Sequence, residues 1–124
     1  MKNLSKQYVR WDDLDAMGHV NNAKYLTYAQ EARFAMLGIF NMVIGRAEVD
    51  FKAPINEGNI FIDVAIWVDS IGTSSFTLKY ELSNNGKILA LIKTVQVAVT
   101  EDTLSSMPLT ENQRELLNTY LETE

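Results

Sequence analysis

The sequence predicts an α+β fold in which an antiparallel sheet of about five strands wraps around one central, largely apolar helix, with a second helix at the C-terminus. Three observations predict this fold. The 124 residues suit one core, so we expect a single domain over residues 1–124. Apolar residues recur at helical spacing between residues 22 and 37. They then alternate at period two through four later segments.

The first elements are a short strand over residues 6–11, a polar loop, and a helix from about Asn22 to Leu37. Asn21 or Asn22 suits the N-cap of this helix, and Gly38 suits the position after its end. Its apolar residues at helical spacing are Tyr25, Tyr28, Ala29, Ala32 and Met36. Because Leu26, Phe34 and Leu37 add apolar groups on other faces, we expect other elements to wrap the helix.

Four strands are predicted after the helix, over residues 46–53, 60–68, 76–82 and 87–99. Pro54 ends the first of them, and Asn85-Gly86 predicts a tight hairpin before the last. We expect these strands to form an antiparallel meander. A C-terminal helix is predicted over residues 110–121, where Thr110 and Gln113 fit a capping box.

Composition excludes several classes of function. There is no cysteine and only one histidine, so neither a thiol nucleophile nor a zinc site is expected, and we expect no metal and no cofactor. A net charge of -5 with scattered basic residues argues against nucleic-acid binding. No apolar run approaches the ~20 residues that a membrane helix needs, and no signal peptide is recognisable. We therefore expect a cytoplasmic protein that binds a small molecule.

The run WDDLDAMGHVNNAKY, residues 11–25, gathers three carboxylates and the histidine just before the helix. Such carboxylates are often solvated loop groups or partners of the helix dipole. A calcium loop is excluded because Met17 and Lys24 stand where ligands would be needed. A serine hydrolase is excluded because no G-x-S-x-G turn is present.

A carboxylate beside a helix start can instead perform acyl chemistry. Unpaired amides at the helix N-terminus polarise a carbonyl group and stabilise an oxyanion, and a nearby carboxylate attacks the carbonyl or activates water. A thioester suits this small apparatus, because its thiolate leaving group needs little help from an acid.

The run also resembles the motif of hotdog-fold acyl-CoA thioesterases, in the branch of 4-hydroxybenzoyl-CoA thioesterase. The matching residues are Val9-Arg10-Trp11-x-Asp13-x-Asp15-x-x-Gly18-His19-Val20-Asn21-Asn22-x-x-Tyr25, followed by Glu31-Ala32-Arg33, Val49-Asp50-Phe51-x-x-Pro54 and Met107-Pro108. The resemblance covers nearly the whole chain and implies the hotdog fold. One departure is a short segment between Leu37 and Gly45, where the family commonly has a longer loop over the acyl pocket.

This resemblance implies that Asp15 is the nucleophile or general base and that the backbone amide near Asn22 polarises the thioester carbonyl. It also implies a homodimer or homotetramer with the acyl-CoA at the subunit interface. His19 is a third catalytic candidate, either positioning substrate and moving protons or holding the loop through a hydrogen bond. Candidates for substrate binding are Gly18, Asn21, Tyr25 and Tyr28, of which the two tyrosines are equally compatible with the core. We expect Asp13 to orient the loop and Asp12 to face solvent.

The predicted function is hydrolysis of a thioester of coenzyme A, or of acyl carrier protein, to a free acid and a thiol. Two alternatives stay open at this point. A hotdog hydratase or dehydratase would use an Asp and a His for proton transfer on the acyl chain. A hotdog protein without activity would bind the acyl carrier only. The sequence does not define the acyl group.

Overall fold

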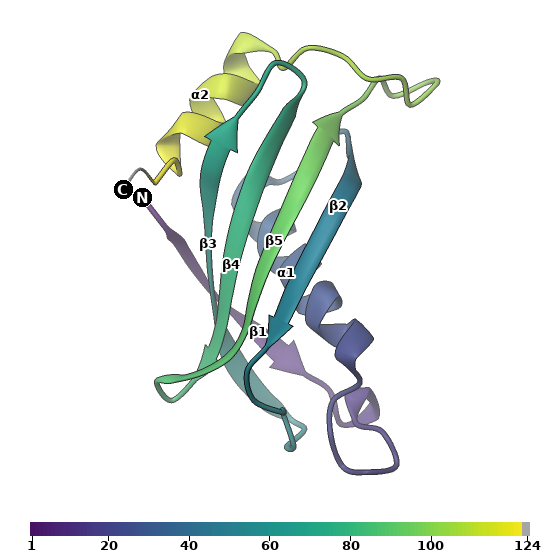
Figure 1. Ribbon diagram of the computed structural model, residues 1–124, viewed down its shortest axis with the longest axis vertical. Coiled ribbons are helices and arrows are strands. Elements are labelled where there is room, and N and C mark those ends of the chain that lie inside the picture. Colours follow the sequence, from purple (N-terminus) through teal and green to yellow (C-terminus); the bar gives the residue numbers. More distant parts are fainter. Residues whose placement is uncertain (123–124) are drawn as a thin grey trace.

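A computed structural model describes residues 1–122 and confirms the predicted α+β fold (Figure 1). One antiparallel sheet has the strand order β1-β3-β4-β5-β2. The long helix α1 lies behind this sheet in Figure 1, and the short helix α2 lies at its upper end. The elements are β1 (Asn3–Val9), the 3-10 turn η1 (Trp11–Asp13), α1 (Asn22–Leu37), β2 (Met42–Phe51), β3 (Ile60–Ile71), β4 (Ser75–Asn84), β5 (Lys87–Ala98) and α2 (Glu111–Thr119).

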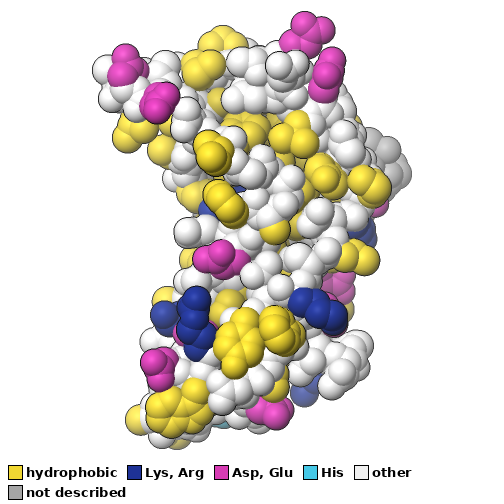
Figure 2. Space-filling view, turned by 180° about the vertical axis from the view of Figure 1, so that it is seen from behind, with side chains coloured by type: hydrophobic (Ala, Val, Ile, Leu, Met, Phe, Trp, Pro, Cys, Tyr) yellow, Lys and Arg dark blue, Asp and Glu magenta, His cyan; other side chains and the backbone are white. Residues whose placement is uncertain are grey.

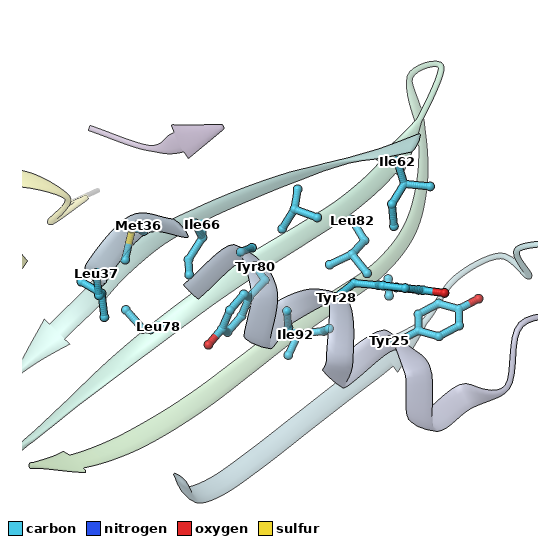
Figure 3. Close-up of a cluster of buried hydrophobic side chains, with 14 of the residues drawn as sticks. Tyr25, Tyr28, Met36, Leu37, Ile62, Ile66, Leu78, Tyr80, Leu82 and Ile92 are labelled. Carbon is cyan, nitrogen blue, oxygen red and sulfur yellow. The ribbon is translucent and has the colours of Figure 1, made fainter. Parts of the chain in front are cut away.

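The core lies between α1 and the inner face of the sheet (Figure 3). Period-two alternation sends every second residue of a strand to one face. The central strands β3 and β4 therefore bury Ile62, Val64, Ile66, Val68, Phe76, Leu78, Tyr80 and Leu82. All five predicted helix positions at helical spacing are also buried: Tyr25, Tyr28, Ala29, Ala32 and Met36. Packing between these two apolar faces is what holds the helix on the sheet.

The prediction of a simple meander is wrong for β2. Strands β3, β4 and β5 do form a meander, and the β4–β5 turn has the expected positive φ angles at Asn85 and Gly86. By contrast, β2 pairs with β5 at the far edge, while β1 pairs with β3. The order of strands in space depends on long-range pairing, which local alternation does not encode.

Several strand boundaries also differ from the prediction, most of all at β1 and β2. The first strand begins at Asn3 and ends at Val9, and Trp11 already belongs to the 3-10 turn. β2 begins at Met42, four residues before the predicted start. The prediction missed these residues because a bulge between Ile44 and Arg46 shifts the register and interrupts the alternation. The C-terminal helix is confirmed, with reciprocal capping between Thr110 and Gln113, but it ends at Thr119.

The expectation that other elements wrap α1 on several faces is met only in part. The sheet covers one side of the helix and also buries Leu37. Leu26 is 39% exposed and Phe34 is 61% exposed, since one sheet can cover only one face of a straight helix. The edge strand β2 is likewise mostly exposed along its length. Within residues 1–122, α1 thus presents exposed apolar side chains, and β2 presents an unpaired strand edge.

Candidate active site

The loop before α1 is anchored by the buried carboxylate of Asp13, which is 4% exposed. Its Oδ2 accepts a hydrogen bond from the Tyr28 hydroxyl at 2.7 Å and another from the Arg10 backbone N–H at 3.1 Å. The Lys24 Nζ lies 3.8 Å from Oδ1. Burial and the hydrogen bond to the Asp13 carboxylate raise the pKa of Tyr28, so its hydroxyl stays protonated and donates. The prediction that Asp13 orients the loop agrees with these contacts, and Asp12 is exposed as expected.

Asp15 is exposed on this loop, and local hydrogen bonds fix its carboxylate. Oδ1 accepts from the backbone N–H of Met17 at 2.8 Å and from that of His19 at 3.2 Å. The Asp15 N–H donates to the His19 carbonyl at 2.7 Å, which closes a tight turn between the two residues. The second carboxylate oxygen, Oδ2, takes part in none of these bonds. It is therefore available to a ligand at the loop surface.

The start of α1 offers one unused amide. The N-cap Asn21 accepts from the Ala23 N–H with its side chain at 2.9 Å and from the Lys24 N–H with its carbonyl at 2.9 Å. The Asn22 N–H has no hydrogen-bond acceptor within the part of the chain that the structure describes. Because the helix dipole adds partial positive charge here, this amide is well suited to a carbonyl oxygen. Of the two predicted N-cap candidates, Asn21 and Asn22, Asn21 is the one that caps the helix.

Asp15 and Asn22 line the same open hollow of about 320 Å³. Its other lining residues are His19, Val20, Asn21, Tyr25 and Pro54. Tyr25 is fixed there, because its hydroxyl donates to the Ala53 carbonyl at 3.3 Å and accepts from the Ile55 N–H at 3.2 Å. Five of the seven residues predicted from the sequence therefore meet in one place: Asp15, His19, Asn21, Asn22 and Tyr25.

The other two predicted residues lie elsewhere. Tyr28 is buried in the core, where it holds Asp13 and does not line the hollow. Gly18 is at the loop tip with φ of 76°, and apart from its chain neighbours no atom of residues 1–122 lies within 4 Å of the point where a Cβ would stand. Backbone conformation and not close packing therefore requires glycine there. His19 holds the loop through its main chain and is also an exposed residue that lines the hollow.

A buried polar cluster under α1 was not predicted from the sequence. The Tyr80 hydroxyl lies 2.6 Å from Thr94 Oγ1 and accepts from Arg33 Nη1 at 2.9 Å, and the Gln96 amide contacts Thr94. Thr94 and Gln96 share the inner face of β5 with Ile92 and Ala98. Two polar residues within this alternation are the signal that could have revealed the cluster.

Family comparison adds an independent observation to this geometry. The model of the thioesterase-like superfamily matches residues 9–117, which include the whole loop, α1, the strands β2 to β5 and most of α2. The chain belongs to the thioesterase-like superfamily. Its membership confirms the resemblance seen in the sequence and the predicted enzyme class, a thioester hydrolase.

Individual members of the superfamily agree with this assignment. A 1,4-dihydroxy-2-naphthoyl-CoA hydrolase from Synechococcus elongatus is 28% identical, over 90% of this chain and 92% of that protein. A thioesterase from Thermus thermophilus, crystallised with coenzyme A and zinc, is 30% identical with a TM-score of 0.85, over 94% of this chain and 92% of that chain. A predicted thioesterase from Bacillus stearothermophilus has the same fold, with a TM-score of 0.91 at 23% identity over 100% of this chain and 99% of that chain.

The described residues include neither a metal-binding cluster nor a membrane-spanning helix. Among residues 1–122, no group of three or more His, Cys, Asp or Glu side chains is arranged to hold a metal ion. No helix in the same range is both long enough and apolar enough to cross a bilayer.

Proposed function

We propose that this thioesterase-like domain, residues 1–124, hydrolyses acyl-CoA thioesters at the hollow between the Asp15 loop and the start of α1. The observation that carries the proposal is the pairing of a fixed carboxylate, Asp15, with the unused Asn22 amide on the same surface. Coenzyme A as the carrier is supported by the hydrolase from Synechococcus elongatus and by the coenzyme A complex from Thermus thermophilus. Because acyl-CoA esters are intracellular metabolites, we also propose a cytoplasmic location.

In the proposed reaction, the thioester carbonyl oxygen accepts a hydrogen bond from the Asn22 N–H, which stabilises negative charge on that oxygen in the transition state. Asp15 then acts in one of two ways. As a nucleophile it forms an acyl anhydride and expels the thiolate, and water subsequently cleaves the anhydride. As a general base it takes a proton from water, which attacks the carbonyl directly. Both routes give one free acid and one thiol.

The hydrogen bonds to Asp15 explain how a short loop can hold a catalytic group. Two backbone amides fix one oxygen of the carboxylate, which leaves the other oxygen to react in a defined direction. The Asn21 cap occupies the second amide of the helix and leaves the first for the substrate. His19 lines the same hollow, where we propose that its imidazole contacts the substrate.

We further propose that the active form is a homodimer, or a tetramer built from such dimers, in which β2 pairs with β2 of a second copy. β2 is an edge strand whose outer backbone groups are unpaired within residues 1–122. The exposed Phe34 of α1 lines one hollow together with Met42 and Ile44 of this strand. A second copy would pair the strand edge and cover these apolar groups, and it would turn the open hollow at Asp15 into a closed site.

The test is release of thiol from a panel of acyl-CoA substrates by the wild-type protein. We expect steady turnover on saturated acyl-CoA esters and the same turnover on 2-enoyl-CoA esters, with no hydration of the double bond. Hydration without thiol release would support a hydratase instead. Tight binding of acyl-CoA in calorimetry with no release of thiol would contradict hydrolysis and support a carrier-binding protein.

A further inference from the structure

The core of this protein has two sets of polar groups along α1. At the N-terminal end, the Tyr28 hydroxyl donates to Asp13 of the active-site loop, and the Tyr25 hydroxyl bonds to the backbone of Ala53 and Ile55. Farther along the helix, the Tyr80 hydroxyl points away from those two groups, toward the opposite side of the cluster (Figure 3). It accepts a hydrogen bond from Arg33 Nη1 at 2.9 Å. The catalytic scheme makes no use of this second polar group.

Arg33 is a half-buried cation, and none of the ion pairs within residues 1–122 includes it. A guanidinium has five N–H donors, and the neutral Tyr80 hydroxyl accepts from Nη1 alone. A cation that is partly removed from water is normally compensated by a carboxylate or phosphate. The position therefore favours an anion from outside residues 1–122.

The surroundings of Arg33 are shaped for a ligand that is mostly apolar. Arg33 lines an open hollow of about 300 Å³ together with Gln30, Asn41 and the apolar side chains of Phe34, Ile39 and Ile44. Ile39 is 92% exposed and Phe34 is 61% exposed. Figure 2 shows hydrophobic side chains exposed in both the upper and the lower half of the face that carries α1. One cation within apolar walls matches an organic anion better than it matches phosphate alone.

The proposed β2–β2 dimer brings this hollow to the reaction centre of the other protomer. β2 is antiparallel to its copy in such a pairing and runs roughly 30 Å from Met42 to Phe51. The Phe51 end of each strand lies beside its own active-site hollow, since the Phe51 ring packs 5.1 Å from the Tyr25 ring. The Met42 end lies at the Arg33 hollow. Antiparallel pairing places the Met42 end of one β2 beside the Phe51 end of the other. Each Arg33 hollow therefore faces the Asp15 hollow of the second copy.

We propose that Arg33, held by Tyr80, binds a carboxylate at the distal end of the acyl group, so that the preferred substrates are ω-carboxyacyl-CoA esters. This inference rests on the proposed function and names its substrate class. The acyl chain lies across the dimer interface, with its thioester at Asp15 of one protomer and its distal carboxylate at Arg33 of the other. The apolar walls contact the methylene groups between them.

The experiment compares matched acyl-CoA pairs of equal chain length: succinyl with butyryl, adipyl with hexanoyl, and suberyl with octanoyl. We expect the wild type to prefer the carboxylated member of at least one pair by about tenfold or more in kcat/KM, because a charged hydrogen bond is lost with the methyl end. Arg33→Gln removes the cation and keeps a helix-compatible side chain. We expect it to abolish this preference through KM.

Lys93→Gln is the matched control, because Lys93 is an exposed cation on β5 whose side chain lies on the opposite face of the sheet from Thr94. It removes the same charge and should leave the preference intact. Tyr80→Phe, checked for folding by circular dichroism, should weaken the preference without removing the cation. Equal rates on both members of every pair in the wild type, or a preference that survives Arg33→Gln, would overturn the proposal. In either case thiol release itself would still support hydrolysis, whereas no release from any ester would refute the proposed function.

Discussion

Replacing Tyr28 by phenylalanine tests whether a buried hydrogen bond holds the active-site loop. Tyr28→Phe keeps the ring in the core and removes only the hydroxyl that donates to Asp13 Oδ2 at 2.7 Å. The carboxylate stays buried and keeps the Arg10 N–H on that oxygen, with Lys24 Nζ no nearer than 3.8 Å to the other. Loss of a hydrogen bond to a buried charge costs about 2 kcal/mol. For a chain of this size, that corresponds to a fall in Tm of roughly 6–10 °C.

The assay is urea unfolding followed by circular dichroism, with thiol release measured on the same preparations. Tyr8→Phe is the matched control, since the Tyr8 hydroxyl donates to Asn59 at 3.0 Å on the exposed surface. The control should lose less than about 0.5 kcal/mol. We expect Tyr28→Phe also to lower kcat/KM, because Asp13 positions the loop that carries Asp15. If the two variants are equally stable and equally active, the argument for a buried anchor is refuted.

Alkaline pH provides a second test of the same contact. Burial and the Asp13 hydrogen bond raise the pKa of Tyr28 above its ordinary value of 10.0. Folding therefore favours the protonated hydroxyl, and this contribution is complete below about pH 10 and is lost as the pH rises toward the folded-state pKa. The free energy of unfolding of the wild type should fall more steeply above pH 10 than that of Tyr28→Phe. Parallel pH profiles would contradict this assignment.

Substitutions at three further positions probe the same loop and the turn that packs against it. Gly18→Ala should cost about 1 kcal/mol in unfolding free energy, because φ of 76° is unfavourable for alanine, and a change below about 0.3 kcal/mol in urea melts would contradict this. Gly58→Ala should be more damaging and should lower both Tm and thiol release, since its Cβ would lie 2.8 Å from the Trp11 Cα. Asn21→Ala should cost about 1 kcal/mol by leaving the Ala23 N–H uncapped. Asn21→Asp, which keeps an acceptor, should restore stability if capping is the cause.

Local patterns predicted the elements of the fold well but not their order in space. The bounds of α1 follow from a strong N-cap at Asn21 and from apolar residues that repeat at helical spacing. β2 was misplaced because its neighbour β5 lies roughly forty residues further along the chain, and its first residues were missed because a bulge hides their alternation. The exposure of Phe34 was also unexpected, since a sequence pattern does not say whether an apolar face is covered by the same chain or by a second copy.

The candidate site was predictable to the extent that its residues are close in sequence. The Asp15 loop and the helix start are adjacent, so their encounter in one hollow required no knowledge of the sheet. The role of Tyr28 was not apparent, because helical spacing alone does not reveal that its hydroxyl reaches back to Asp13. The Arg33 cluster was missed for a different reason: it joins α1 to β4 and β5, and only the three-dimensional structure brings these elements together.

The most direct test of the account compares Asp15→Asn with Asp12→Asn in single-turnover thiol release. Both changes remove one negative charge from the same loop, but Asp15 lines the hollow and Asp12 does not. If one carboxylate opposite the start of α1 performs the chemistry, Asp15→Asn should slow the reaction by at least about a hundredfold with folding intact, while Asp12→Asn stays near wild type. Thiol release by Asp15→Asn within a few fold of the wild type would contradict the account.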